Sequence, residues 1–239
     1  MPNKPIQIAK SIFSGFLDLI YPPFCLVCEQ AGEEYLCAQC IETIDVIEAP
    51  FCRKCGIPCA SYHCSDCQER EYYFEQACSA GVYEGVLKNA IHQLKYKFHI
   101  AMADPLAEFM VRSFANTGFR GKFDLVIPIP IHHSRKIERG FNQAEELAWR
   151  FCKRRSIVLE RDVLYKKKDT KHQANLSQDM RAVNLQGVFA VRNAEKIAGK
   201  RILLIDDVFT TGSTLNEAAK ALKEAGASTV CAYTLARSL

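Results

Sequence analysis

Four pairs of cysteines, each with two residues between its members, occupy 43 residues near the N-terminus of this 239-residue chain. A Cys-x2-Cys turn places two thiolates on one side of a tight loop, and two such turns complete the tetrahedral shell that Zn²⁺ prefers. The spacing therefore predicts a small zinc-binding domain, residues 25–70, with two sites of four cysteines. The predicted ligands are Cys25, Cys28, Cys37, Cys40, Cys52, Cys55, Cys64 and Cys67.

The order of the pairs leaves two pairing schemes open. Consecutive pairing closes each site locally, so we favour it over a cross-braced arrangement that alternates the pairs. Cys59 lies outside this regular spacing and could replace Cys64 or Cys67. A closed four-cysteine site has no open position for a substrate, so we expect both sites to be structural. Three isolated cysteines in apolar contexts are expected to be buried: Cys78, Cys152 and Cys231.

Residues 1–24 are expected to form an amphipathic helix, because four apolar residues share one of its faces (Ala9, Phe13, Phe16 and Ile20). Lys10 and Asp18 interrupt the apolar run, and no small-residue cleavage pattern follows it. We therefore expect neither a membrane span nor a secretory signal. The cytoplasm is then the expected compartment, where paired cysteines usually hold metal rather than form disulfides.

Charge is divided unevenly along the chain. Residues 1–70 carry a net charge of −4 and the remainder carries +8. A basic domain favours polyanionic partners, either nucleic acid or a phosphorylated small molecule.

Apolar periodicity after residue 70 predicts strands that alternate with helices. This order indicates a second domain, residues 71–239, built as a mostly parallel sheet flanked by helices. The polar, basic segment 165–184 is expected to be a mobile loop that closes over a bound anion, and the alternative is a permanently flexible surface loop. The expected strands are 77–83, 124–129, 201–205 and 229–235, and the expected helices are 86–98, 104–116, 140–155 and 213–225.

The run from Arg201 to Thr214 carries the strongest signal for chemistry. Four apolar residues predict a buried strand, and Asp206 and Asp207 follow at its carboxyl end, where open α/β sheets bind ligands. A turn rich in hydroxyls then begins a helix, so its N–H groups and hydroxyls converge on one spot suited to an anion. The residues of this turn are Thr210, Thr211, Gly212, Ser213 and Thr214.

This run resembles the ribose-phosphate motif of type I phosphoribosyltransferases. The resemblance implies that the two aspartates contact the ribose hydroxyls of phosphoribosyl pyrophosphate and that Thr210 to Thr214 hold its 5-phosphate. It also implies a magnesium ion, held mainly by the ligand's own oxygens. The family binds pyrophosphate with a loop after an early strand, here residues 128–143, where Arg139 is our choice of ligand-binding residue.

The whole chain resembles the ComF family of competence-associated proteins. That family implies a role in natural transformation. The protein would act where incoming single-stranded DNA enters the cytoplasm, and its partner would be a helicase. The resemblance rests on the cysteine pairs, on Leu94-Lys95-Tyr96, on Arg139-Gly-Phe-Asn-Gln-Ala144, on Gln173-Ala-Asn-Leu-Ser177 with Arg181, Asn184, Gly187 and Phe189, on the Asp-Asp motif and on Leu235-Ala-Arg237.

Single-stranded DNA is expected on the basic domain, through Lys88, Lys95 and Lys97 of the predicted helix 86–98. The alternative for this stripe is an ordinary solvated helix face.

Three functions fit the sequence. The first is a protein that binds phosphoribosyl pyrophosphate and magnesium and handles single-stranded DNA in transformation. The second is an active phosphoribosyltransferase with an unidentified acceptor, although residues 165–191 offer no recognisable aromatic clamp for a base. The third is a zinc-bearing adaptor with a vestigial ligand site.

Overall fold

The structure is a computed structural model that describes residues 24–239, except for 33, 97–98 and 168–186. The expected N-terminal helix, Lys97 and most of the expected loop 165–184 lie outside the described residues. Within the described part, no helix is both long and apolar enough to span a bilayer.

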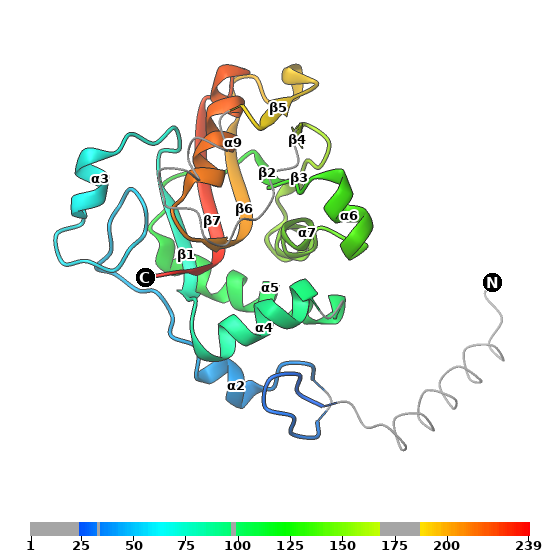
Figure 1. Ribbon diagram of the computed structural model, residues 1–239. Helices are drawn as coiled ribbons and strands as arrows, with labels where there is room; N and C mark the ends of the chain where they lie inside the picture. Colours follow the sequence, from blue (N-terminus) through cyan, green and yellow to red (C-terminus); the bar gives the residue numbers. More distant parts are fainter. Residues whose placement is uncertain (1–23, 33, 97–98, 168–186) are drawn as a thin grey trace.

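A five-stranded parallel sheet forms the centre of the molecule (Figure 1). Its strand order is β1-β7-β6-β2-β3, and every neighbouring pair runs parallel. The expected mostly parallel sheet is confirmed. The strands are β1 Ala77–Val82, β2 Leu125–Pro128, β3 Val158–Leu159, β6 Arg201–Phe209 and β7 Thr229–Arg237.

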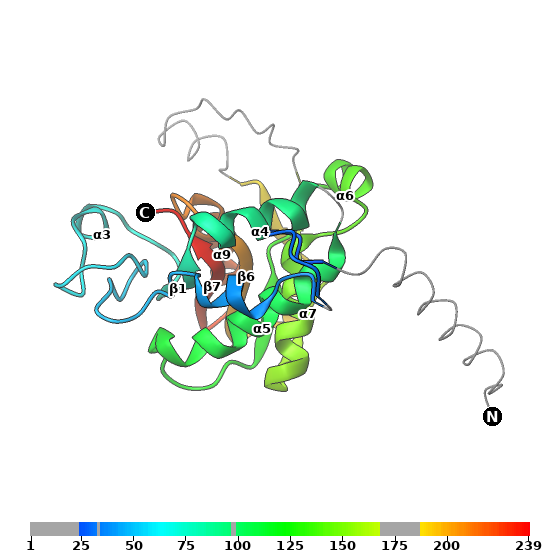
Figure 2. The ribbon, with the colours of Figure 1, turned by 90° about the horizontal axis from the view of Figure 1, so that it is seen from below.

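Helices cover both faces of this sheet (Figures 1 and 2). Side chains alternate along a strand, so Leu203 and Ile205 of β6 lie in the core that α4, α5 and α7 cover. Ile202 and Leu204 lie in the opposite core, under α9. The antiparallel pair β4–β5 stands on the α9 side. The bounds are α4 Gly85–Tyr96, α5 Ala103–Ser113, α7 Gln143–Arg155, α9 Ser213–Glu224, β4 Leu164–Lys166 and β5 Phe189–Val191.

Two expected boundaries were wrong. Strand β6 continues to Phe209, four residues beyond the predicted end, because β7 supplies backbone partners as far as Arg237 opposite Phe209. The expected helix 140–155 starts at Gln143 instead. The chain before it forms a separate helix, α6 (His133–Arg139), which ends at Gly140 with a left-handed φ of 74°.

Short helical segments complete the fold. Helix α5 begins at Ala103 and ends at Ser113. A 3₁₀ turn at Phe114–Thr117 then continues the chain toward the predicted end of that helix. The remaining segments are α2 Ala38–Glu42, α3 Ser65–Glu69 and the 3₁₀ turns Ile100–Met102 and Ala194–Lys196.

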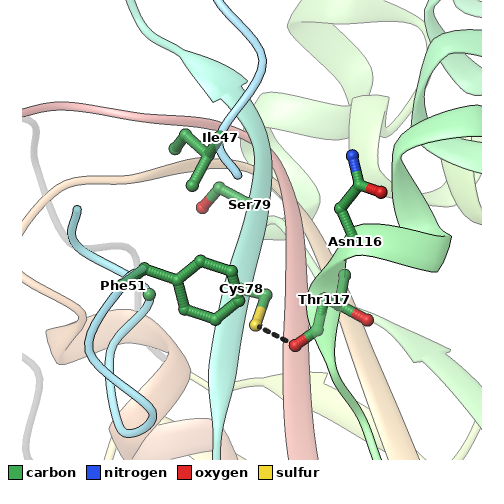
Figure 3. Close-up of a pocket in the computed structure, with 7 residues that line it drawn as sticks. Ile47, Phe51, Cys78, Ser79, Asn116 and Thr117 are labelled. Atoms are coloured by element: carbon green, nitrogen blue, oxygen red, sulfur yellow. Dashed lines mark hydrogen bonds between the residues drawn. The ribbon is translucent and has the colours of Figure 1, made fainter. Parts of the chain in front are cut away.

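The two cysteine clusters lie at different places on the sheet domain. In Figure 1, α2 of the first cluster lies beside α4, and α3 of the second lies on the side of β1 and the C-terminus. The chain between the clusters crosses β1, where the Ile47 N–H donates to the Ala80 carbonyl oxygen over 3.1 Å. Figure 3 shows the hollow at this crossing, where the Cys78 thiol donates to the Thr117 carbonyl oxygen over 3.2 Å. It is too narrow for a water molecule, so we assign it no ligand.

The three isolated cysteines are buried, as expected: Cys78, Cys152 and Cys231.

Candidate functional site

The eight paired cysteines form two compact clusters. Cys25, Cys28, Cys37 and Cys40 make the first, and Cys52, Cys55, Cys64 and Cys67 make the second; in each, all sulfur atoms lie within 4.8 Å of one another. Consecutive pairing of the Cys-x2-Cys turns is therefore confirmed. Cys59 belongs to neither cluster and packs, partly buried, against the core under α9.

The sulfur spacing tests whether zinc fits. An ideal tetrahedron with zinc–sulfur bonds of about 2.3 Å has sulfur–sulfur edges of about 3.8 Å. The Sγ atoms of Cys25 and Cys40 are 3.8 Å apart, those of Cys28 and Cys37 are 3.7 Å apart, and those of Cys55 and Cys64 are 3.7 Å apart. Both clusters thus have the donor set and the size of a closed structural zinc site.

Asp206 and Asp207 lie near the carboxyl end of β6, and Asp207 forms an ion pair that the sequence did not predict. The Lys95 ammonium of α4 lies 2.7 Å from the Asp207 carboxylate, and their side chains are only 19% and 13% exposed. Burial by itself would lower the pKa of Lys95, but the Asp207 carboxylate outweighs it and raises that pKa above its usual value. Lys95 is therefore a charged partner within the site.

Asp206 has the opposite environment. Burial, and then the neighbouring Asp207 carboxylate, raise its pKa from 3.8 to about 7. One of its oxygens accepts the Asp207 N–H over 2.8 Å. The end of β6 therefore holds one carboxylate neutralised by an ammonium and one that binds a proton near neutral pH.

The turn from Thr210 to Gly212 connects these aspartates to α9. The Thr211 and Ser213 hydroxyl oxygens are 2.9 Å apart, and the Ser213 N–H donates to Thr211 Oγ1 over 3.4 Å. Gly212 has a φ of 79°, and a Cβ there would lie 2.5 Å from Cζ of Phe209. Only glycine suits this position, and the turn brings two hydroxyls to the N-terminus of a 12-residue helix.

The segment after β2 lies next to the same sheet edge, because β2 and β6 are adjacent parallel strands. The Ile129 N–H donates to the Ile205 carbonyl oxygen over 2.8 Å, and the Asn142 amide donates to the Ile129 carbonyl oxygen over 3.0 Å. Asn142 also caps α7. Arg139 is the last residue of α6, not part of an open loop as expected, and its role remains a prediction.

The predicted DNA-binding lysines fall in different places. Lys88 is exposed on α4, with its ammonium 6.0 Å from the centre of the Tyr83 ring. Lys95 pairs with Asp207 instead of lying on that exposed face, because its position on α4 faces the end of β6. Lys97 is outside the described residues. We therefore retain Lys88 and Lys97 as candidate DNA contacts and group Lys95 with the candidate site at the end of β6.

The sequence did not predict two neighbours of the turn, one aromatic and one cationic. Phe209 packs beneath Gly212, and the guanidinium of Arg237 lies 4.3 Å from the centre of its ring. Arg237 was visible only as part of a family motif. The parallel register that places it opposite Phe209 is a property of the sheet, which a single sequence does not reveal.

Two protein-family models match the chain. The model described as "Phosphoribosyl transferase domain" covers residues 94–238, more than half of the sequence, and the model described as "Double zinc ribbon domain" covers residues 16–69. Strand β6 with its two aspartates thus lies in the first match, and both cysteine clusters lie in the second.

Curated proteins with related names also match. The chain is 34% identical to Competence protein F of Haemophilus influenzae over 48% of this chain and 51% of that protein, about half its length. It is 32% identical to DNA utilization protein YhgH of Escherichia coli O6:H1 over 66% of this chain and 70% of that protein. It is 31% identical to Competence protein ComFC of Bacillus subtilis over 67% of this chain and 63% of that protein.

Among solved structures, the chain resembles a glutamine phosphoribosylpyrophosphate amidotransferase from B. subtilis complexed with ADP and GMP. The identity is 19%, the TM-score is 0.36, and the match covers 54% of this chain and 25% of that one. This distant similarity adds nothing to the family match. On the sequence relatives and the two matching domains, the chain belongs to the ComF family, as a phosphoribosyl transferase domain preceded by a double zinc ribbon.

Proposed function

We propose that this protein binds phosphoribosyl pyrophosphate together with magnesium at the end of β6 and handles incoming single-stranded DNA during natural transformation. The observation that carries the ligand is the sequence of two aspartates, a hydroxyl-rich turn and a helix N-terminus within a phosphoribosyl transferase domain. Carboxylates accept hydrogen bonds from ribose hydroxyls, and the adjacent N–H groups and hydroxyls suit a phosphate.

The named relatives support the biological role. Two are competence proteins and a third is a DNA utilization protein. We extend this role to the present chain, with single-stranded DNA and a helicase as its partners in the cytoplasm. Lys88 beside the Tyr83 ring gives α4 a cation and an aromatic surface, the combination that binds unpaired strands without reading their sequence.

Calorimetric titration with phosphoribosyl pyrophosphate, with and without magnesium, tests the ligand. We expect magnesium-dependent binding, lost when Asp206 and Asp207 are both replaced by asparagine. A matched control is Glu224→Gln, which neutralises one acid at the far end of α9. Equal binding by the wild type and the double variant would contradict the assignment.

Absence of binding by the wild type would favour the adaptor with a vestigial site. The remaining alternative is transfer of the phosphoribosyl group to an acceptor. The observation that favours it is the β4–β5 pair, which stands on the side of the sheet that α9 covers and offers a surface for an acceptor. Release of pyrophosphate in the presence of a pool of bases would establish transfer.

A further inference from the structure

The second cysteine cluster contacts the end of the sheet through Arg237, the last residue of β7. The Arg237 side chain is buried, and one of its terminal nitrogens donates to the Cys55 carbonyl oxygen over 2.6 Å. Its other terminal nitrogen lies 3.5 Å from the Cys55 sulfur. One guanidinium therefore contacts both the backbone and the thiol of a predicted zinc ligand.

The same guanidinium also contacts strand β6, which leads into the turn Thr210–Gly212, called here the phosphate turn. It stacks 4.3 Å from the centre of the Phe209 ring, and the Ser238 N–H donates to the Phe209 carbonyl oxygen over 2.9 Å. Phe209 in turn fills the space beneath Gly212, where even a methyl group would overlap the ring. A displacement of Arg237 would therefore reach the turn through one rigid aromatic side chain.

A second set of contacts, which shares Phe209 with the first, joins the cluster to the start of α9. Lys54 lies between Cys52 and Cys55 in the sequence, and its ammonium donates to the Phe74 carbonyl oxygen over 2.5 Å. The buried Phe74 ring meets Phe209 edge-on, with 6.3 Å between ring centres. The neighbouring Tyr73 N–H donates to the side-chain oxygen of Asn216 on the first turn of α9 over 2.6 Å.

Charge strengthens the first set of contacts. A zinc ion with four thiolates carries a net charge of −2, so the filled cluster is the natural counter-ion for the buried Arg237 cation. Without the metal, the loops that carry Cys52 and Cys64 lose the bond that holds them together, and Arg237 loses the fixed position of Cys55.

We propose that the second zinc cluster positions the phosphate turn Thr210–Gly212, and that Arg237 and Phe209 are the positioning residues between them. Metal occupancy of Cys52, Cys55, Cys64 and Cys67 and anion binding at the turn are then linked equilibria, each favouring the other. The ligand half of this inference rests on the proposed binding of phosphoribosyl pyrophosphate; the positional half rests only on the contacts above.

The first cluster supplies a matched control, because it contacts a different part of the molecule. Its residues Cys25 and Cys40 belong to the core under α4 and α5. The Gln93 amide of α4 donates to the Leu26 carbonyl oxygen over 2.9 Å. Loss of metal from this cluster should therefore loosen α4, and it should disturb the turn after β6 less than loss from the second cluster does, because α4 reaches the end of β6 through the Lys95–Asp207 pair and not through the turn itself.

The experiment compares Cys64→Ser with Cys28→Ser in the full chain, by metal analysis and amide hydrogen exchange. Each variant should lose about one zinc ion. Exchange in residues 210–216 should accelerate at least roughly tenfold in Cys64→Ser, and exchange in α4 should accelerate in Cys28→Ser. Equal effects of the two variants on residues 210–216, or no effect of Cys64→Ser despite loss of its zinc, would overturn the proposal.

Two further measurements keep the result clear if Cys64→Ser folds poorly. Phe209→Leu should keep both zinc ions and weaken phosphoribosyl pyrophosphate roughly tenfold, about 1.4 kcal/mol. In the wild type, that ligand with magnesium should slow release of one zinc ion to a colorimetric chelator, and Phe209→Leu should abolish this protection. Unchanged ligand affinity in Phe209→Leu, or equal protection of both ions, would contradict the linkage. A wild type that binds no ligand would refute the proposed function, while the exchange comparison would still decide the positioning role.

Discussion

Replacing Asp206 with asparagine should stabilise the ligand-free protein near neutral pH while removing the proposed ribose contact. The reason is the raised pKa of Asp206, about 7 in the folded protein against 3.8 normally. Between these two values the unfolded chain releases a proton that the folded chain keeps. Stability therefore falls as the pH rises from about 4 to about 7, and asparagine, which has no proton to lose, removes this penalty.

The magnitude follows from the same two values. Each pKa unit corresponds to ~1.36 kcal/mol, so the difference between 3.8 and about 7 sets a maximum gain of roughly 4 kcal/mol at pH 8. At pH 5.5 the corresponding maximum is roughly 2 kcal/mol. Asp206 keeps some solvent contact, so measured gains should be smaller, but they should still about double between these pH values. The asparagine side-chain oxygen can still accept the Asp207 N–H.

Asp207→Asn provides the opposite case one residue away. It removes the carboxylate that lies 2.7 Å from the Lys95 ammonium and leaves that cation mostly buried without its partner. Breaking a buried pair from one side typically destabilises a protein by roughly 3 kcal/mol or more. Two substitutions of the same kind, at adjacent positions, should therefore shift stability in opposite directions.

Urea unfolding of the wild type and both variants between about pH 5.5 and pH 8 measures these effects. Magnesium is omitted because it would bind the carboxylates, and chelators are omitted because they would strip zinc. A destabilised Asp206→Asn, or a gain that does not grow with pH, would refute the assigned environment of Asp206. If Asp206→Asn stabilises the protein but weakens ligand binding, Asp206 is a residue retained for binding and not for stability.

The remaining predictions concern the metal, the turn and DNA. Purified protein should contain two zinc ions, and one ion or none by metal analysis would contradict the two-cluster assignment. Gly212→Ala should lower the free energy of unfolding by roughly 2–3 kcal/mol, because its φ is positive and the added methyl overlaps Phe209. Gly199→Ala, which also has positive φ but open space around it, should cost only about 1 kcal/mol. Lys88→Glu should weaken single-stranded DNA binding, and the affinity should fall steeply with salt; equal binding at low and high salt would exclude backbone contacts.

The cysteine clusters were predictable because their ligands lie close together in the sequence. Each cluster is closed by two neighbouring Cys-x2-Cys turns, and no distant part of the chain is needed. Local spacing therefore predicted the donor set and favoured the consecutive pairing that the structure shows. The same holds for the turn after β6, where Gly212 and the hydroxyls before and after it are consecutive residues.

Features that depend on distant contacts were less accessible. The continuation of β6 through two aspartates contradicts their weak strand propensity, and pairing with β7 makes it possible. Helix α6 lies in a segment that resembled a ligand-binding loop. Lys95 looked like one of several surface cations on a helix, and only the packing of α4 against the end of β6 reveals its pairing with Asp207.

The Lys95 pair also resolves an apparent conflict in the proposed site, where two acidic side chains stand next to a predicted phosphate turn. Two unpaired carboxylates would repel a ligand that carries several phosphate charges. Lys95 neutralises Asp207, and Asp206 binds a proton near neutral pH, so the end of β6 has little net charge before the ligand arrives. When magnesium accompanies the ligand, its positive charge favours ionised Asp206 and can replace that proton. The carboxylates are then free to accept hydrogen bonds from neutral ribose hydroxyls, while the phosphate faces the N–H groups and hydroxyls of the turn. On this argument Lys95 belongs to the proposed binding site as fully as the two aspartates do.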